Sequence, residues 1–214
     1  MLKVLSFTFN PFRENTYLVV NEAHETIVID PGMYDKSELT EFYTYIEHHQ
    51  LKPVKILNTH AHIDHILSVE ALKQKYQIPF ALHEGELPVL ANATYASMMY
   101  GIKLAAIPKV DFYLKEGENI SFGTSQLKLL LTPGHSPGSI SFYAPKEGFV
   151  ISGDVLFQNS IGRTDLPGGN YEQLIESIQR KMFSLPDKTT VYPGHGPITR
   201  IDVEKEYGFL AKCL

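Results

Sequence analysis

Three of the chain's nine histidines and one aspartate lie within residues 59–65, which read "THAHIDH" and follow the apolar run "VKIL" after a single asparagine. Imidazole and carboxylate groups are the usual ligands of zinc and similar divalent ions. His60, His62 and Asp64 alternate along the sequence, so in an extended segment their side chains share one face. His65 joins them if the chain turns tightly there. The stretch therefore predicts a metal-binding loop at the end of a buried strand, and the fold must bring further ligands to that loop.

More candidate ligands stand after other apolar runs. His135 lies in "LLLTPGHSPGS", Asp154 in "GFVISGDVLF" and His195 in "TTVYPGHGP". Glycine beside each of them permits the backbone angles of a tight turn and a close approach to a bound group. Four groups from one loop are too few to supply the ligands of two metal sites. We therefore expect these three side chains to lie close to the first four in the folded chain.

The hydrophobic pattern alternates between strands and helices along the chain. Helices are expected at about 35–50, 67–76, 86–108 and 171–183, with a helical C-terminal tail. Strands are expected at 3–9, 15–20, 26–30, 54–59, 80–83, 111–114, 119–122, 126–132, 140–144, 148–154 and 189–194. This order indicates an α/β protein made of two related halves, and 214 residues fit a single domain spanning 1–214.

The motifs "THAHIDH", "TPGHSPGS", "GD" and "PGHG", in this order, resemble the metallo-β-lactamase superfamily over essentially the whole chain. The stretch "GDVLFQNSIGRTDLPGGNYEQL" is similar to glyoxalase II-like hydrolases, of the hydroxyacylglutathione hydrolase type, and also to the persulfide dioxygenase branch. The resemblance implies an αβ/βα four-layer sandwich, in which two mixed sheets carry helices on their outer faces and metals at one edge.

The same resemblance implies a ligand set and a pair of divalent ions, with zinc as the first expectation and iron or manganese as alternatives. It assigns a first metal to three histidines, a second metal to one aspartate and two histidines, and a bridge to one further aspartate. In that order the residues are His60, His62 and His135; Asp64, His65 and His195; and Asp154.

The implied chemistry is hydrolysis of a small-molecule thioester by a metal-bridging hydroxide, with Asp64 both a ligand and a catalytic residue. A thiolate leaving group suits zinc because sulfur is a good zinc ligand. Arg163 is the candidate contact to a substrate carboxylate, and the alternative is that Arg163 and Asp165 form a structural clasp within "GRTD". Aromatic residues expected of the glutathione-binding pattern are replaced by Asp165 and Pro197, and the helical domain of long-form members is missing, so we expect a short-form thioesterase with a looser thiol requirement.

Several alternatives remain open from the sequence. A mononuclear iron enzyme of the persulfide dioxygenase type uses a subset of the same ligands, and a lactone hydrolase uses the same hydroxide. A non-catalytic metal-binding domain is a third reading, against which the complete ligand set argues. The apolar segment 91–108, with Tyr95, Met98, Met99 and Tyr100, is expected to be a core or dimer helix, or else a wall of the acyl pocket.

Composition excludes other classes of protein. The net charge of −5 and a pI near 6.0 argue against a nucleic-acid partner, and no apolar run approaches the length of a membrane span. The single cysteine, Cys213, cannot form an internal disulfide, and no export signal is visible, so we expect a cytoplasmic protein without β-lactamase activity. Assembly into a homo-oligomer is left open.

Overall fold

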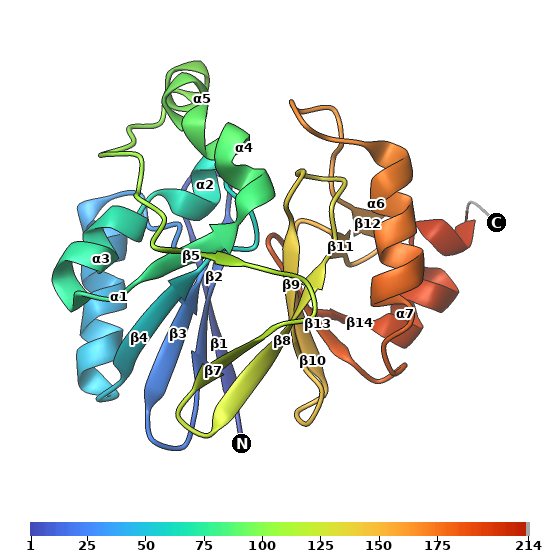
Figure 1. Ribbon diagram of the computed structural model, residues 1–214, viewed down its shortest axis with the longest axis horizontal. Helices are drawn as coiled ribbons and strands as arrows, with labels where there is room; N and C mark the ends of the chain where they lie inside the picture. The colour runs from blue at the N-terminus through green and yellow to red at the C-terminus, as the bar shows by residue number, and fades with distance from the viewer. Residues whose placement is uncertain (213–214) are drawn as a thin grey trace.

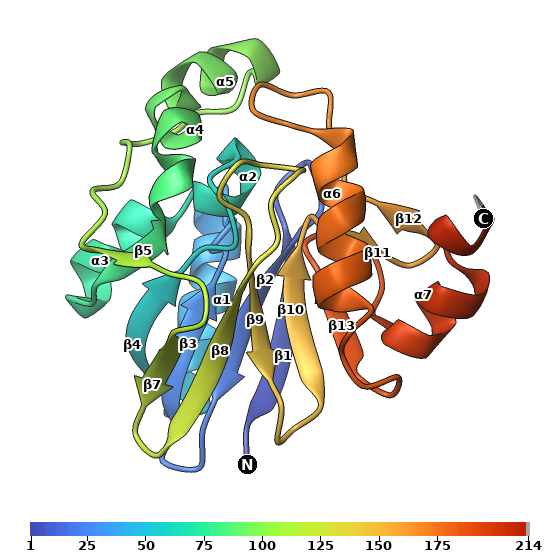
Figure 2. The ribbon, with the colours of Figure 1, turned by 45° about the vertical axis from the view of Figure 1, so that its right-hand side comes forward.

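Two six-stranded mixed sheets pack face to face, and helices cover their outer faces (Figures 1 and 2). The computed structural model describes residues 1–212, so Cys213 lies outside the described residues. α1 and α3 lie outside the first sheet, and α6 and α7 lie outside the second (Figure 1). This arrangement confirms the four-layer αβ/βα sandwich expected from the sequence. Among the described residues, no helix has the length and apolar character needed to cross a membrane.

The first sheet has the order β1-β2-β3-β4-β5-β6. β1, β2 and β3 are antiparallel neighbours, and β3 to β6 run parallel. Parallel neighbours need crossover connections, which helices supply here. The strands are β1 Lys3–Phe9, β2 Glu14–Val20, β3 Glu25–Ile29, β4 Lys52–Leu57, β5 Phe80–His83 and β6 Phe112–Leu114. The connecting helices are α1 Lys36–His48, α2 Ile63–Ile66, α3 Val69–Tyr76, η1 Glu84–Glu86, α4 Leu87–Ala91 and α5 Ala93–Tyr100.

The second sheet has the order β14-β13-β10-β9-β8-β7, with only the β10–β13 pair parallel. Its strands are β7 Asn119–Phe122, β8 Ser125–Leu131, β9 Ile140–Ala144, β10 Phe149–Gly153, β13 Thr190–Pro193 and β14 Thr199–Arg200. A small ribbon consists of β11 Leu156–Phe157 and β12 Ser160–Ile161. The helices of this half are α6 Tyr171–Ser177, the π-helical turn η2 Ile178–Met182, α7 Ile201–Tyr207 and η3 Leu210–Lys212.

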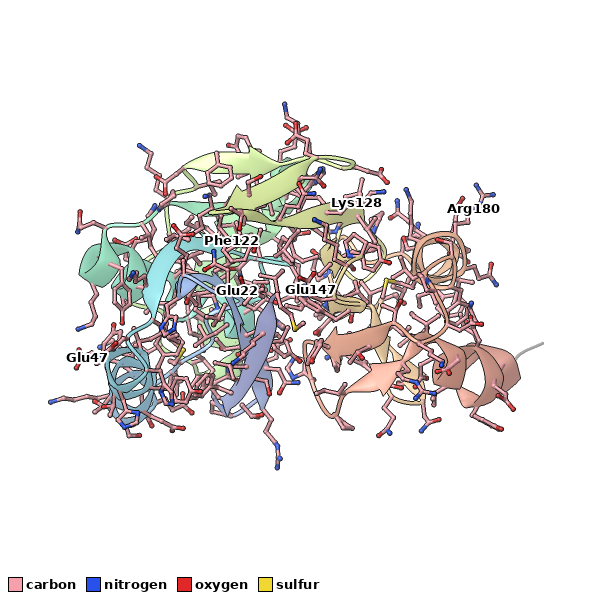
Figure 3. All side chains as sticks on the ribbon, turned by 90° about the horizontal axis from the view of Figure 1, so that it is seen from below. Glu22, Glu47, Phe122, Lys128, Glu147 and Arg180 are labelled. Carbon is pink, nitrogen blue, oxygen red and sulfur yellow. The ribbon has the colours of Figure 1, made fainter. Side chains whose placement is uncertain are left out.

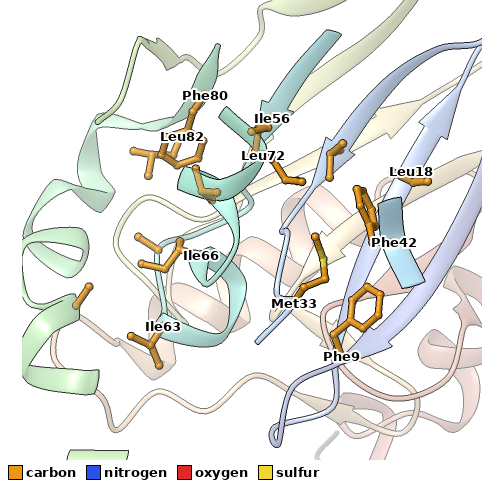
Figure 4. Close-up of a cluster of buried hydrophobic side chains, with 14 of the residues drawn as sticks. Phe9, Leu18, Met33, Phe42, Ile56, Ile63, Ile66, Leu72, Phe80 and Leu82 are labelled. Carbon is orange, nitrogen blue, oxygen red and sulfur yellow. The ribbon is translucent and has the colours of Figure 1, made fainter. Parts of the chain in front are cut away.

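The buried hydrophobic side chains form three clusters, and neighbouring residues of an inner strand belong to different clusters. In β2, Tyr17 and Val19 join the cluster between the two sheets, whereas Leu18 packs toward α1 and α3. Successive side chains of a strand point to opposite faces, so a strand buried on both sides supplies both layers. Figure 4 shows the helix-facing layer, in which Phe42 of α1 lies among side chains that include Leu18 and Met33. A third cluster lies between the second sheet and α6, η2 and α7.

The expected helix over 86–108 is wrong beyond Tyr100 and wrong as a core helix, whereas a dimer helix or a wall of the acyl pocket stays a prediction. α5 ends at Tyr100 because Gly101 adopts a left-handed conformation (φ 65°), which closes the helix at its C-cap. Tyr95, Met98 and Met99 are exposed, so they do not form a core helix. They lie on the face of α5 opposite Ala93, which packs into the first sheet's cluster.

Strand polarity gathers the functional loops at one end of the sandwich. β3, β4 and β5 are parallel, and their carboxyl ends are followed by Asp30, the loop 58–62 and η1. β10 and β13 are also parallel and lead to Asp154 and His195. This end carries α2, α4 and α5 and is uppermost in Figure 1. Figure 3 shows the opposite end, where the turns that carry Glu22 and Glu147 lie between the helical flanks.

Candidate metal centre

A tight turn after β4 brings the four groups of "THAHIDH" together. The Asn58 side-chain amide donates to the carbonyl oxygens of His60 (3.2 Å) and His65 (2.8 Å). The backbone is extended at His62 (φ −63°, ψ 152°) and becomes helical at Ile63, where α2 begins. The change from extended to helical backbone turns His65 back toward His60, whose ring centroid lies 4.1 Å away. The turn predicted for His65 is confirmed.

The first triad consists of His60, His62 and His135, which the loop between β8 and β9 carries. His62 Nδ1 lies 2.8 Å from His135 Nε2, and His135 Nε2 lies 3.3 Å from His60 Nε2. Three ring nitrogens thus point at one small volume. The structure places these residues together as the sequence predicted, although they come from two different sheets.

The second triad consists of Asp64, His65 and His195. Asp64 Oδ2 lies 3.2 Å from His195 Nε2 and 3.7 Å from His65 Nε2. The Asp64 side chain is 13% exposed and that of His195 26%, whereas His65 is fully buried. His195 and Asp64 thus reach solvent, as does the half-buried His62 of the first triad.

Asp154 lies between the two triads. Its Oδ2 is 3.5 Å from both His135 Nε2 and His195 Nε2, and its Oδ1 is 3.6 Å from His65 Nε2. Gly194 leaves room for this carboxylate, because a Cβ at that position would lie 2.0 Å from Asp154 Oδ1. Oδ2 thus lies near one histidine of each triad and Oδ1 lies near a second histidine of the second triad, which is a suitable position for a bridging ligand.

The donor set fits divalent cations. His65 Nε2 and Asp154 Oδ1 are buried and have no hydrogen-bond partner among the described residues, which is costly unless something binds them. Five imidazoles and two carboxylates match the ligand preference of zinc and of similar transition metals. The centre therefore offers two adjacent positions, each with three side-chain ligands, and a shared carboxylate.

Burial and charge prepare the two triads differently. Burial, with His135 nearby, lowers the pKa of His62 to about 3, and burial also lowers the pKa values of His60 and His135. These rings are therefore neutral at neutral pH and present lone pairs. Burial also acts to lower the pKa of His65, but the carboxylates of Asp64 and Asp154 outweigh it and raise the pKa. The second triad thus lies where negative charge favours a cation.

The ring nitrogens that face away from the centre are held by fixed partners. His65 Nδ1 donates to Asp30 Oδ2 (3.1 Å), and His60 Nδ1 donates to Thr59 Oγ1 (2.9 Å), which in turn donates to Asp30 Oδ2 (2.6 Å). Partners of this kind fix the tautomer and orientation of a ligating histidine. Sequence reasoning missed Asp30, although its place at the end of the "TIVID" strand was a usable signal.

Arg163 is held by its own loop. Its Nε and one terminal nitrogen donate to the two carboxylate oxygens of Asp165, at 2.7 and 2.8 Å, so the clasp given as the alternative is present, and the contact of Arg163 with substrate stays a prediction. The guanidinium lowers the pKa of Asp165 to about 2. The carbonyl oxygen of Arg163 accepts from His135 Nδ1 (2.7 Å), so the clasp adjoins the first triad. The guanidinium is thereby neutralised beside the centre before any substrate arrives.

Sequence comparison places this geometry among known proteins. The family model described as "Metallo-beta-lactamase superfamily" matches residues 9–195. The chain is 41% identical over 198 residues to a "Probable metallo-hydrolase YqgX" of Bacillus subtilis, with 92% of this chain and 91% of that protein covered. It is 32% identical over 201 residues to a "Hydroxyacylglutathione hydrolase GloC" of Haemophilus influenzae, with 91% of each chain covered.

Solved structures share the fold at similar coverage. The crystal structure of BLEG-1 B3 metallo-beta-lactamase superposes with a TM-score of 0.90 at 37% identity, covering 98% of this chain and 99% of that one. The structure of TTHA1623 in a di-iron-bound form gives 0.86 at 38% identity, covering 95% and 98%. ETHE1 from Myxococcus xanthus gives 0.77 at 26% identity, covering 99% and 85%.

Proposed function

Because the chain belongs to the metallo-beta-lactamase superfamily, we propose that it is a dinuclear metallohydrolase that cleaves small-molecule thioesters of the hydroxyacylglutathione type. The observation that carries the proposal is the position of Asp154, whose two oxygens face ligands of both triads. The similarity to a protein named hydroxyacylglutathione hydrolase supports the choice of thioesters.

In this proposal, the seven converging side chains hold two ions. The first triad and the second triad hold one each, and Asp154 bridges them. Zinc is the first choice because imidazole and carboxylate ligands suit it, and iron and manganese are the alternatives. Iron is supported by a similar solved structure, 38% identical in sequence, which is in a di-iron-bound form.

The chain's own residues prepare the centre for hydrolysis. When bound, two divalent ions supply an acidified water and a Lewis acid for a carbonyl oxygen. Asp64, which lies 3.2 Å from His195, would ligate one ion and orient the attacking hydroxide. Asp30 keeps the His65 ring in place through Nδ1, and buried neutral His60 and His62 need no proton removed before they ligate. The mechanism needs no protein nucleophile.

The test combines metal content with turnover. The wild type, Asp64→Asn, His62→Ala and the control His49→Ala, which changes an exposed histidine at the end of α1, are assayed on S-D-lactoylglutathione and on S-lactoyl-N-acetylcysteamine. We expect the first two variants to lose most of the activity and His62→Ala to lose metal as well, while His49→Ala keeps both. Thioester turnover by His62→Ala without metal would overturn the proposal. A single iron per chain with oxygen uptake would favour the persulfide dioxygenase alternative.

β-Lactam hydrolysis is a second candidate, because a structure with a TM-score of 0.90 and 37% identity is named a B3 metallo-beta-lactamase. The same centre can attack an amide or a lactone carbonyl. To rank these activities, kcat/KM is measured for a chromogenic cephalosporin, an acyl-homoserine lactone and the two thioesters. We place thioesters first because the chain resembles the glyoxalase II-like hydrolases from "GDVLF" to "NYEQL".

Two further expectations remain proposals. We place the enzyme in the cytoplasm, where a chain with one cysteine needs no oxidising environment. We also treat residues 1–214 as one domain, because the cluster between the sheets takes side chains from both halves.

A further inference from the structure

A buried carboxylate lies between the two loops that carry the first triad. Glu86, the last residue of η1, is fully buried. Its Oε2 accepts from the backbone N–H of Ala61 (2.8 Å), and its Oε1 accepts from Ser136 Oγ (2.5 Å) and the N–H of Gly138 (2.6 Å). Three donors on two oxygens are strong, charge-assisted hydrogen bonds in a site shielded from water.

All three donors lie in the two loops that carry the first triad, and two of them adjoin its ligands. Ala61 stands between His60 and His62, and Ser136 directly follows His135. The two loops belong to different sheets, and a backbone hydrogen bond from the Ile140 N–H to the Thr59 carbonyl oxygen (2.8 Å) also joins the first loop to β9. Glu86 therefore ties the His60–His62 loop to the His135 loop through one carboxylate.

The chain is built to let η1 approach the His135 loop closely. A Cβ at Gly138 would lie 2.8 Å from His83 Nδ1 and 2.9 Å from the backbone nitrogen of Glu86. A Cβ at Gly85 would lie 3.1 Å from the Cα of Gly138. His83 Nδ1 accepts from the N–H of Gly85 (3.1 Å), which fixes the start of η1. A side chain at Gly138 would therefore push η1 away from the His135 loop, and one at Gly85 would crowd the same contact by a few tenths of an ångström.

Asp30 anchors His65 of the second triad and, through Thr59, also His60 of the first triad. Asp30 accepts from the Thr59 N–H (2.7 Å) and from His65 Nδ1, whereas the described contacts of Glu86 include no residue of the second triad. We propose that Glu86 is a positioning residue that sets the affinity of the first triad for its ion by holding the two loops at the spacing the ion needs. This inference rests on the proposed metal centre.

The decisive variant is Glu86→Gln. It keeps the size of the side chain, but its amide nitrogen must face one of the three donors, so one loop loses its anchor. Glu84→Gln is the matched control, because Glu84 is exposed, lies in the same turn and loses the same charge. Each protein is stripped of metal, checked by circular dichroism, and titrated with Co²⁺ while the visible absorption and the bound equivalents are recorded.

We expect the wild type and Glu84→Gln to bind two equivalents with similar affinities. Glu86→Gln should bind one equivalent about 10–100-fold more weakly and the other as before. In a double variant with His62→Ala, Glu86→Gln should add little, because both changes act on the same triad. Full-affinity binding of both equivalents by folded Glu86→Gln would overturn the inference.

A milder variant covers the case in which Glu86→Gln does not fold. Ser136→Ala removes one of the three donors, and it should weaken the same equivalent by a smaller, several-fold factor. Unchanged affinity in Ser136→Ala would then count against the role of Glu86. Wild-type protein that binds no Co²⁺ would instead overturn the metal centre itself, so the two failures are distinguishable.

Discussion

At the scale of single residues, three of the converging histidines are oriented in the same way. Each of three histidines turns one nitrogen to the centre and donates from the other to a fixed acceptor. The acceptors are Asp30 for His65, the Arg163 carbonyl for His135 and the Phe12 carbonyl for His195. Ring orientation is thus set before any ion binds, which lowers the cost of binding.

Asp30 should matter although it is not among the seven converging groups. In Asp30→Asn, an amide nitrogen replaces an acceptor that serves Thr59 and His65. We expect metal affinity and kcat/KM to fall about 10–100-fold with the fold retained. Metal titration and kinetics check this, with Asp187→Asn as the control because Asp187 forms an exposed ion pair with Lys205. Wild-type affinity in Asp30→Asn would contradict it.

We expect Asp165 to lower the preference of the enzyme for thioesters whose thiol portion carries carboxylates. In Asp165→Ala, the Arg163 guanidinium is released beside the first triad. We expect a several-fold rise in kcat/KM for S-D-lactoylglutathione, which carries carboxylates, relative to S-lactoyl-N-acetylcysteamine, which carries none. An unchanged ratio would show that Arg163 does not contact substrate.

The ion pair between Arg163 and Asp165 also predicts how the substrate preference depends on pH. The pKa of Asp165 is lowered to about 2, so the carboxylate stays charged and the clasp is lost only as the pH falls through that value. The substrate ratio of the wild type should therefore be constant from neutral pH down to about pH 4. A rise in preference for the glutathione thioester across that range would mean that Arg163 is freed by another route.

At the scale of elements, the site depends on strands held in place by helices outside the sheets. Phe42 of α1 is fully buried against the first sheet, in the same cluster as Ala61 and Ile63 of the ligand loop. Phe42→Ala should lower the free energy of unfolding by about 3–5 kcal/mol, because it leaves a cavity in a packed core. Denaturant unfolding measures this, and a loss below about 1 kcal/mol would show that α1 packs loosely.

Local sequence signals predicted the elements unevenly. The strand ends that carry His135, Asp154 and His195 were predictable, because an apolar run followed by glycine and a polar ligand is a local pattern, and His60 was predictable from the cluster of histidines after its strand. The end of α5 had a local signal in Gly101, but the apolar run that continues to Pro108 masked it, and apolar content alone cannot tell a buried helix from an exposed one. The acceptors at Phe12 and Arg163 are backbone carbonyls, which no side-chain pattern reveals.

At the scale of the whole molecule, the ions should join the two halves of the sandwich. Their ligands come from loops of both sheets, and the cluster between the sheets draws on β2 and β3 from one side and on β8, β9 and β10 from the other. Removing metal with a chelator should therefore lower the unfolding midpoint of the entire chain in one transition. Ligand at about 100 times its Kd stabilises the folded state by about 2.7 kcal/mol. Calorimetry in which only one half responds would contradict a shared centre.

The most direct test of the account is the number of divalent ions per chain in protein purified without added metal, measured by mass spectrometry of the elements. We predict about two ions per folded wild-type chain, since two triads and a bridging carboxylate hold them. In Asp154→Ala the count should fall below two. A folded wild-type chain that retains no ion, and gains none when zinc, iron or manganese is supplied, would contradict the central claim.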